Sequence, residues 1–398
     1  MSLISGLREW HEQFTAWRRD LHAHPQTAFE ETYASEFVRT KLRDFGIGVH
    51  CGLAKTGVVG TLVGSAPASG KLRAIALRAD IDALDIQEQN ELPYKSSFPG
   101  KMHACGHDGH TTMLLAAARY LAQTRRFAGT VHFIFQPAEE NEGGGRVMVE
   151  EGLFDRFPVD AVFGLHNWPG LPIGEFAVAN GPAMAAFDVF EIAVNGRGTH
   201  AAMPHVGVDP IVAGSQIVSA LQTIASRETD PLDQIVVSIT QFHAGDTWNV
   251  IPAQAILRGT VRTFQETTRA RAEKSIGRIA AGIAAAHGAQ AEVRYERRYP
   301  ATINTPQETE WAAGAAVDVV GNEHVARDAQ PCMGSEDFAY MLQVRPGCYI
   351  WAGNGTADNG RLLHSPYYDF NDDLIPVGAS YWIRLVEKLL PVHSSREN

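Results

Sequence analysis

The fold is decided by the stretch HTTMLLAAARYLAQTRRFAGTVHFIFQ, residues 110–136. Its first part, 110–126, is rich in Ala and Leu, which are strong helix formers. Its last part, TVHFIFQ (130–136), is rich in β-branched and aromatic residues and is almost continuously apolar. A run of this kind is typical of a strand buried on both faces, as in a parallel sheet. The stretch therefore predicts a helix followed by a fully buried strand.

Similar runs lie on either side of this stretch. LRAIALRA (72–79) and DAVFGLH (160–166) have the same buried-strand character, and GGGRVMVEEGLF (143–154) is a helix candidate. CYIWAG (348–353) is a further strand, and 7–45 has the apolar spacing of two helices. This alternation predicts an α/β fold in which helices flank a mostly parallel central sheet.

The pattern changes after about residue 182. FDVFEIAVNG (187–196) alternates apolar and polar side chains, which is typical of a strand with one exposed face. Helical and alternating segments continue to about residue 299 in the order β-α-β-β-α-β, which is the ferredoxin-like order. We therefore expect an inserted α+β domain, 183–298, within a larger domain made of 1–182 and 299–398.

Composition narrows the function classes. The chain has 34 Lys and Arg against 45 Asp and Glu, a net charge of −11, so it lacks the basic surface of a general nucleic-acid binder. No apolar stretch reaches the roughly 20 residues of a membrane span, and the N-terminus lacks a signal-peptide pattern. The four cysteines are too scattered for a disulfide framework. We expect a cytoplasmic globular protein that binds neither nucleic acid nor membrane.

Polar side chains follow the predicted buried strands. Asp80 and Asp82 come after the first strand, Glu139 and Glu140 come after the second, and His166 ends the third. Because ligands bind at the carboxyl edge of an open α/β sheet, these side chains are candidate site residues. The alternative is that the acids merely cap the helices that follow. For Asp82 the two interpretations stay equally open.

The segment MHACGHDGHTTM (102–113) is the densest cluster of candidate ligands. In an extended segment Cys105 and His107 point the same way, and thiolate and imidazole are good ligands for zinc or a neighbouring first-row metal. Taken singly, such residues are more often an inert buried cysteine and a hydrogen-bonded core histidine. The density of the cluster favours metal binding. The other cysteines form no paired knuckle, which argues against a structural zinc finger.

The adjacent acids indicate hydrolytic chemistry. One carboxylate can bind a metal while the other takes a proton from a metal-bound water, because the metal lowers the pKa of that water toward ~7. The candidate ligands are Cys105, His107, Glu140, His166 and His364. These ligands are too many for one tetrahedral ion that also holds a water, so we expect two ions.

A set of long motifs in a common order carries a family resemblance. They are MHACGHDGHTTMLL, FQPAEENEGGG, GLHNWPGLPIGE, NGRGTHAAMPHVGVDPI, NVIPAQAILRGTVRTF, MGSEDFAYM and LHSPYYDFNDD. Together they resemble the amidohydrolase branch of the dinuclear metallopeptidase family that includes aminoacylases. Hippurate hydrolases, N-acyl-amino-acid deacylases and plant auxin-conjugate hydrolases belong to this branch. The resemblance extends from RRDLHAHPQTAFEE (18–31) to about residue 373.

The resemblance implies a zinc-peptidase-like catalytic domain and a role for each candidate ligand. Cys105 corresponds to the ligand that bridges two metal ions. His107 and His166 correspond to ligands of one ion, and Glu140 and His364 to ligands of the other. The resemblance thus implies two divalent ions per subunit. Thiolate and imidazole ligands favour zinc, with manganese, cobalt or nickel as alternatives.

Further residues of the larger domain match the family pattern or depart from it. Glu139 corresponds to the general base that activates the bridging water, and Asp80 to an acid that orients the ligands. Arg78 stands where related peptidases have a metal-binding histidine, so the resemblance makes His107 the replacement ligand. Asp85 replaces the proline that is more usual in this branch, a loop difference with no evident consequence.

The inserted domain corresponds to the family's lid and dimerisation domain. His200 resembles a residue that reaches the neighbouring subunit's active site and stabilises the oxyanion of the tetrahedral intermediate. A loop histidine with local hydrogen bonds is the alternative. Asn249 and Arg262 resemble the pair that binds the substrate's α-carboxylate, to which a guanidinium fork is well suited. We therefore expect a homodimer or a higher homo-oligomer formed through this domain.

These observations predict an enzyme. The expected reaction is metal-dependent hydrolysis of the amide bond of an N-acyl amino acid, such as a hippurate-like substrate, which releases a carboxylic acid and a free amino acid. A dipeptidase or metallo-exopeptidase using the same site is the first alternative, because it also needs a free α-carboxylate. A metal-free binding protein that keeps only the fold is the second.

Overall fold

The computed structural model describes residues 1–68 and 70–392. Contacts divide the chain into two compact units. The first unit comprises Met1–Ala183, Ile303–Gln330 and the chain from Asp337 onward, and the second comprises Met184–Thr302 and Pro331–Glu336. No helix within the described ranges combines the length and the apolar character that crossing a bilayer requires.

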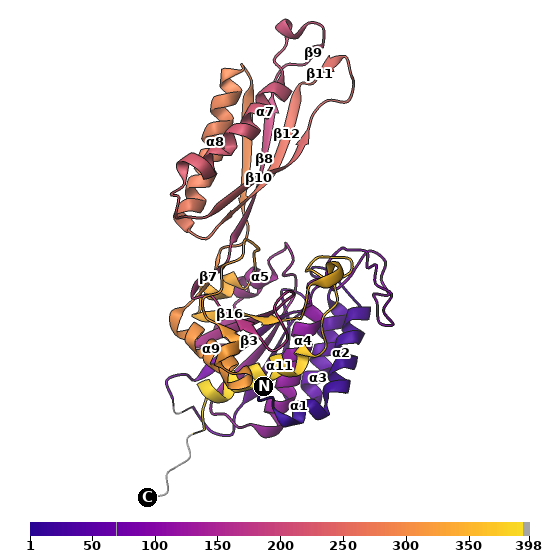
Figure 1. Ribbon diagram of the computed structural model, residues 1–398, viewed down its shortest axis with the longest axis vertical. Coiled ribbons are helices and arrows are strands. Elements are labelled where there is room, and N and C mark those ends of the chain that lie inside the picture. Colours follow the sequence, from indigo (N-terminus) through magenta and orange to yellow (C-terminus); the bar gives the residue numbers. More distant parts are fainter. Residues whose placement is uncertain (69, 393–398) are drawn as a thin grey trace, which may run out of the picture. The chain divides into compact units, whose positions relative to one another are not determined.

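The first unit is built on an eight-stranded sheet with the strand order β1-β2-β4-β3-β5-β16-β6-β15. Figure 1 labels β3 and β16 of this sheet. The strands are β1 (Gly48–Leu53), β2 (Gly57–Val63), β3 (Ala74–Asp80), β4 (Thr130–Gln136), β5 (Ala161–Trp168), β6 (Phe176–Ala177), β15 (Val325–Ala326) and β16 (Gly347–Gly353). The central strands β4, β3, β5 and β16 are parallel neighbours. They are the four strands that the apolar runs predict, and every residue of β3 and β16 is buried. The predicted α/β fold with a mostly parallel sheet is confirmed.

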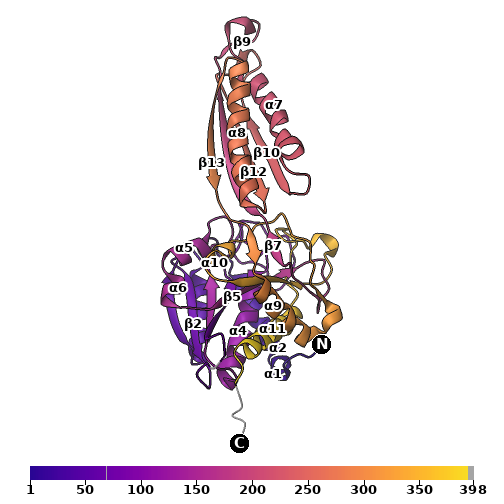
Figure 2. The ribbon, with the colours of Figure 1, turned by 90° about the vertical axis from the view of Figure 1, so that its left-hand side faces the viewer.

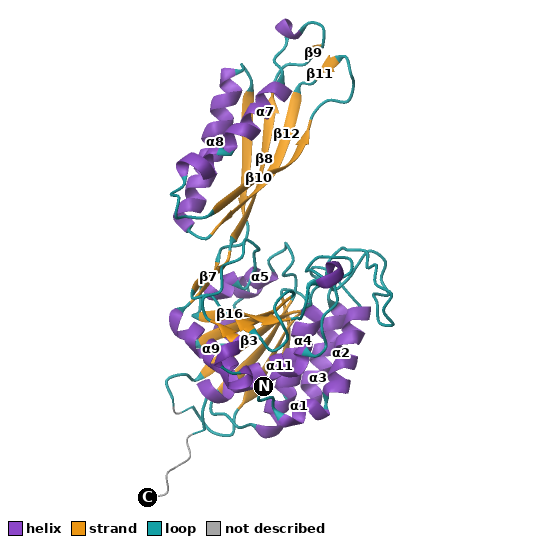
Figure 3. Ribbon diagram, in the orientation of Figure 1, coloured by secondary structure: helices purple, strands orange, loops and turns teal. Residues whose placement is uncertain are grey.

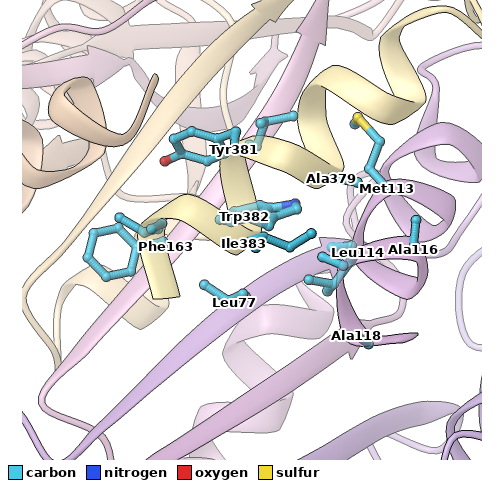
Figure 4. Packing of buried hydrophobic residues seen from close by; sticks show 14 of the residues in the cluster. Leu77, Met113, Leu114, Ala116, Ala118, Phe163, Ala379, Tyr381, Trp382 and Ile383 are labelled. Carbon is cyan, nitrogen blue, oxygen red and sulfur yellow. The ribbon is translucent and has the colours of Figure 1, made fainter. Parts of the chain in front are cut away.

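Helices flank this sheet (Figure 3). They are α1 (Ser5–Glu9), α2 (His11–Ala23), α3 (Thr32–Asp44), α4 (His107–Thr124), α5 (Gly144–Glu150), α6 (Leu153–Arg156), α9 (Pro306–Val320), α10 (Ala339–Leu342) and α11 (Leu374–Leu389), with 3-10 turns at Asn322–His324 and Asp358–Gly360. The apolar face of α11 packs on α4 and α9, and Trp382 and Ile383 lie in the core near Leu114 (Figure 4). Gly378 allows the close approach of α11 to α4, since a Cβ there would lie 2.1 Å from the sulfur of Met113.

Two predicted helical segments are divided in the structure. The segment 7–45 holds α2 and α3 and the end of the short α1, where two helices were expected. The helix predicted over 143–154 is confirmed for Gly144–Glu150 as α5, but its last part is wrong, because α6 is a separate helix from Leu153 onward. Gly152 lies between them with a φ of 86°, a left-handed conformation that ends the first helix.

The second unit contains a four-stranded antiparallel sheet with the order β10-β12-β8-β13. Its main elements are β8 (Ala186–Asn195), α7 (Pro210–Leu221), β10 (Ile235–His243), β12 (Gln254–Thr263), α8 (Glu266–Ala286) and β13 (Gln290–Arg297). Its short elements are β9 (Thr199–His200), β11 (Val250–Ile251), a 3-10 turn at Pro204–Val206 and a π-helix at Ile224–Glu228. Two further short strands, β7 (Gly181–Met184) and β14 (Thr302–Asn304), pair with each other and lie mostly within the first unit. Helices α7 and α8 pack together beside the sheet (Figure 2). The chain order is the β-α-β-β-α-β order that the sequence predicts.

The second unit differs from the expected range 183–298, because its first segment runs from Met184 to Thr302 and a second segment is added. Residues 331–336, which were expected in the larger domain, belong to the second unit. The backbone N–H of Ala185 donates to the carbonyl oxygens of Cys332 and Gly334, at 3.1 and 2.8 Å. The two segments are far apart in the sequence, so no local sequence pattern predicts this contact.

A buried ionic network joins α2 to the first turn of α4. Nδ1 of His22 lies 2.8 Å from Oδ2 of Asp108, and its Nε2 lies 3.3 Å from Oε1 of Glu88. Arg18 is also fully buried and donates to Asp372 at 2.6 Å. Burial alone lowers the pKa of His22, but the hydrogen bonds to Asp108 and Glu88 outweigh burial and raise the pKa to about 9. The network ties α2 to the helix on which His107 stands.

The raised pKa of His22 predicts a loss of stability at alkaline pH. A histidine whose pKa is near 6.5 in the unfolded chain and about 9 in the folded chain stabilises the fold fully below pH 6.5. This contribution is lost as the pH rises through 9, and it should amount to about 3 kcal/mol. We expect His22→Gln to unfold more easily than wild type at pH 6.5, and the difference in unfolding free energy to shrink at pH 9.5. Urea unfolding followed by tryptophan fluorescence measures both. A difference that is unchanged between the two pH values would contradict the prediction.

Candidate metal centre

The candidate site lies at the carboxyl ends of three neighbouring parallel strands. Asp80 is the last residue of β3, Glu139 and Glu140 follow the end of β4, and His166 lies near the end of β5. β4, β3 and β5 are adjacent, and Asp80 pairs with Gln136 at the end of β4. The parallel register therefore gathers side chains that come from three distant parts of the sequence.

The turn before α4 adds Cys105 and His107 to the same edge. Gly106 has a φ of 96°, and a Cβ at this position would lie 2.1 Å from Oδ1 of Asn167. Glycine is therefore the residue that this turn accommodates. The turn places Sγ of Cys105 3.4 Å from Nε2 of His166, while His107 becomes the first residue of α4.

The structure brings all five predicted ligands into one cluster. The ligand atoms of Cys105, His107 and His166 lie within 4.8 Å of one another, and so do those of Cys105, Glu140 and His364. Cys105 is the member that both groups share. The two groups correspond to the two ion positions that the resemblance implies, with the thiolate between them.

The hydrogen bonds of His107 leave one ring nitrogen available. Nδ1 lies 3.0 Å from the carbonyl oxygen and 3.1 Å from Oδ1 of Asp82, so it carries the proton. Nε2 is buried and has no hydrogen-bond partner within the described part of the chain. A buried ring nitrogen without a partner is costly whether or not it carries a proton, and a cation bound to its lone pair would satisfy it. The residues present therefore fit a metal ion.

The charges of the cluster also favour cations. Hydrogen bonds to Cys105 and Glu140 raise the pKa of His364 to about 10. Burial alone lowers the pKa of His107, but the negative charges of Asp80 and Cys105 outweigh burial and raise it well above its usual value. The raised pKa values of His107 and His364 indicate negative potential around these two rings, whereas burial and the nearby His110 lower the pKa of His166 well below its usual value. Divalent cations would neutralise this potential and displace those protons.

Glu139 lies beside both groups. A carboxylate oxygen of Glu139 is within 4.8 Å of the ligand atoms of His107 and Glu140. The residue is 7% exposed, and its carboxylate accepts a hydrogen bond from the backbone N–H of Asp337 at 3.4 Å. This position suits a group that exchanges protons with a water held at the cluster.

Asp80 orients its neighbours and belongs to a buried network. Its two oxygens lie 2.6 Å from Nδ1 of His110 and 2.8 Å from Nη1 of Arg78. Arg78 is also buried, and it donates to Gln136 at 2.8 Å and to Asp337 at 3.0 Å. The guanidinium of Arg78 thus connects Asp80 to Asp337, and the backbone N–H of Asp337 donates to Glu139. The sequence shows Arg78 as a departure from related peptidases but does not show this connection.

Asp82 lies at the site, whereas the sequence left open whether it is a site residue or a helix cap. The helix-capping alternative is wrong, because α4 begins at His107 and is preceded by Gly106. One oxygen of Asp82 lies 3.1 Å from Nδ1 of His107, and the other accepts the backbone N–H of Glu140 at 2.9 Å. Asp82 therefore orients one candidate ligand from each group. Asp337 was also missed as a site residue, although the motif MGSEDFAYM contains it.

The other predicted site residues lie in the second unit. His200 is exposed at the end of β9, and its Nδ1 accepts the backbone N–H of Ala202 at 3.0 Å. Asn249 directly precedes β11, and its carbonyl oxygen accepts the N–H of Ala201 at 2.9 Å. Pairing of β9 with β11 thus brings His200 and Asn249 together at one end of this unit.

Arg262 lies at the other end of the second unit. It stands eight residues after Gln254, the first residue of β12, which at the rise of a strand is about 27 Å. Its guanidinium lies 4.1 Å above the ring of Phe187 and donates to Ser335 at 3.1 Å. Within one chain, Asn249 and Arg262 therefore do not form the pair that the sequence suggested.

Comparison with known proteins places this architecture in a family. The model of peptidase family M20/M25/M40 matches residues 76–388. The chain is 39% identical over 390 residues to a hippurate hydrolase of Campylobacter jejuni, covering 98% of this chain and 100% of that protein. It is 41% identical over 381 residues to an N-acetylcysteine deacetylase of Bacillus subtilis, covering 95% and 97%. A solved Bacillus subtilis structure, described as a dinuclear metal binding peptidase, superposes with a TM-score of 0.83 and 38% identity over 96% of this chain and 99% of that one. The chain belongs to peptidase family M20/M25/M40.

Proposed function

We propose that this protein is a metal-dependent amidohydrolase that cleaves the amide bond of N-acyl amino acids. The substrates would be hippurate-like, and the products a carboxylic acid and a free amino acid. The observation that carries the proposal is the pair of candidate ligand groups that share Cys105, with the carboxylate of Glu139 beside them. The names of the hippurate hydrolase and the N-acetylcysteine deacetylase support this substrate class.

Two divalent ions are the proposed cofactors. His107 and His166 would hold one ion, and Glu140 and His364 would hold the other. Cys105 would be a ligand of both ions. A thiolate and imidazoles favour zinc, and manganese, cobalt or nickel are the alternatives to be tested. When bound, such ions supply Lewis acidity, which polarises an amide carbonyl and lowers the pKa of water.

The protein's own residues would move the protons and hold the substrate. Glu139 would accept a proton from the attacking water and pass it to the nitrogen of the leaving amine. Asp80 would keep His107 and His110 in their orientations. His200 would donate a hydrogen bond to the oxyanion of the tetrahedral intermediate.

The proposed carboxylate-binding pair would come from two chains. Asn249 and Arg262 lie at opposite ends of the second unit, so they could meet at one carboxylate only if each came from a different subunit. This separation supports a homodimer or higher homo-oligomer in which 183–298 serves as a lid and dimerisation domain and the remaining chain as the catalytic domain. The cytoplasm stays the proposed location, on the basis of composition.

A substrate panel tests the proposed function. The protein, loaded in turn with Zn²⁺, Mn²⁺, Co²⁺ and Ni²⁺, would be given N-benzoyl-glycine, N-acetyl amino acids and unblocked dipeptides, and the release of free amino acid would be measured. We expect at least about tenfold higher kcat/KM for an N-acyl amino acid than for any dipeptide, because the exposed ammonium of a dipeptide would have to be desolvated. A chelator should abolish the activity. Faster hydrolysis of dipeptides would indicate an exopeptidase. A protein that binds no metal and shows no chelator-sensitive activity would indicate a binding protein.

A further inference from the structure

The turn that carries Glu139 has an unusual backbone conformation. Ala138, directly before Glu139, has a φ of 54°, which is uncommon for a residue with a side chain. Its carbonyl oxygen accepts the N–H of Gly144 at 2.8 Å. A Cβ on Gly144 would lie 1.8 Å from the carbonyl oxygen of Pro137, so the turn is packed without spare room. A strained conformation of this kind persists only where its surroundings hold it.

The buried carboxylate of Glu31 holds this turn from a distant part of the chain. Oε1 of Glu31 accepts the backbone N–H of Ala138 at 2.9 Å and that of Phe29 at 3.0 Å. Oε2 accepts the hydroxyl of Thr56 at 2.6 Å. Glu31 is the residue before α3, where an acid often stabilises a helix N-terminus, but its side chain makes no capping hydrogen bond.

Burial of the Glu31 carboxylate costs free energy, because an ionised acid loses its hydration. The residue is 0% exposed, and the donors that it binds here are neutral. Burial, followed by the negative charge of Asp82, raises the pKa of Glu31 to about 7. Asp82 in turn accepts the N–H of Glu140 at 2.9 Å. The two backbone amides on either side of Glu139 therefore both donate to buried carboxylates.

We propose that Glu31 is a positioning residue for the reaction: by holding the N–H of Ala138 it keeps this residue left-handed and so directs Glu139 toward the candidate metal centre. The role follows from geometry, since the backbone of Ala138 sets the direction from which the next side chain leaves the turn. A displacement of about 1 Å at a reacting group can reduce turnover about 100-fold. The assignment rests on the proposed function of Glu139.

Three variants separate positioning from general stability. Glu31→Gln keeps a carbonyl oxygen for Ala138 and offers an amide to Thr56, so its kcat should stay within about twofold of wild type. Glu31→Met has a similar volume but no acceptor, and its kcat should fall at least about tenfold with KM and metal content little changed. Thr56→Val is the matched control, because it removes a hydrogen bond to the same carboxylate without touching Ala138. Its kcat should stay near wild type even if its Tm falls.

Amide hydrogen exchange provides a readout that does not depend on activity. Measured on the full-length proteins with and without added Zn²⁺, exchange in the segment 137–143 should be faster in Glu31→Met and unchanged in Glu31→Gln and Thr56→Val. Unchanged kcat and exchange in Glu31→Met would overturn the proposal, as would an equal loss of kcat in Thr56→Val. If Glu31→Met does not fold, a folded Glu31→Gln with tenfold lower kcat overturns it. If wild type hydrolyses nothing in the panel, the proposed function fails, while the exchange data still decide whether Glu31 holds the turn.

Discussion

Glu139→Gln is expected to lower kcat about 100- to 10,000-fold while the protein keeps its metal ions. The substitution preserves the size of the side chain, and its carbonyl oxygen can still accept the N–H of Asp337, which lies 3.4 Å from Oε1 in the structure. What it removes is the ability to take a proton and return it to the leaving amine. Steady-state kinetics on the best N-acyl amino acid, together with elemental analysis of the same sample, measure both quantities.

Two neighbouring acids provide controls for this experiment. Glu142→Gln changes an exposed carboxylate of the same loop and should leave kcat unchanged. Glu140→Gln removes a candidate ligand, so it should reduce metal content as well as turnover. Wild-type turnover in Glu139→Gln would remove this residue from the mechanism. Loss of metal from Glu139→Gln would instead indicate that Glu139 is a metal ligand.

Cys105→Ala is expected to weaken the binding of both ions, because Cys105 belongs to both candidate ligand groups. Loss of an outer hydrogen-bond partner of a metal ligand typically reduces metal affinity 10- to 100-fold, so loss of a direct ligand should reduce it at least about 100-fold. His166→Gln and His364→Gln each change only one group. Each of these variants should therefore weaken the binding of one ion and leave about one equivalent of metal bound. Titration of the metal-free proteins with Zn²⁺ gives the stoichiometry and affinity for each variant.

Cys348→Ala is the matched control for the thiol. Cys348 is a second buried cysteine of the first unit, on β16, and burial raises the pKa of its thiol far above the usual value. It belongs to neither ligand group. This variant should bind two equivalents of Zn²⁺ with wild-type affinity. Wild-type binding of two ions by Cys105→Ala would contradict the shared role of this residue.

The strands of the first unit could be predicted because their signal is local. In β3 and β4 the apolar character continues along the whole strand, since both faces of a central strand are covered. The candidate ligands could be predicted because thiolate, imidazole and carboxylate side chains are dense in the segment 102–113 and recur after the buried strands. The break at Gly152 was less visible, because an isolated glycine in a helical pattern is compatible with either a helix end or a tolerated interior residue.

Hydrogen-bond partners could not be predicted in the same way. Glu31 and Ala138 are 107 residues apart in the sequence. Nothing in the composition of either segment indicates which acidic side chain is buried. The same holds for Asp82, whose spacing from the strand is equally suited to capping a helix. In the second unit, the sequence suggested that Asn249 and Arg262 act as a pair. The length of β12 places them at opposite ends of the unit.

The sequence by itself determined the buried parallel strands, the inserted β-α-β-β-α-β segment and the set of five candidate ligands. These follow from periodicity and residue chemistry, which are properties of short stretches. Only the tertiary structure decided that these ligands form two groups around Cys105 and that residues 331–336 belong to the second unit. It also decided that Glu31, Asp82 and Asp337 hold the turn beside Glu139. Such relations depend on which distant segments become neighbours in the packed sheet, and local patterns carry no information about that choice.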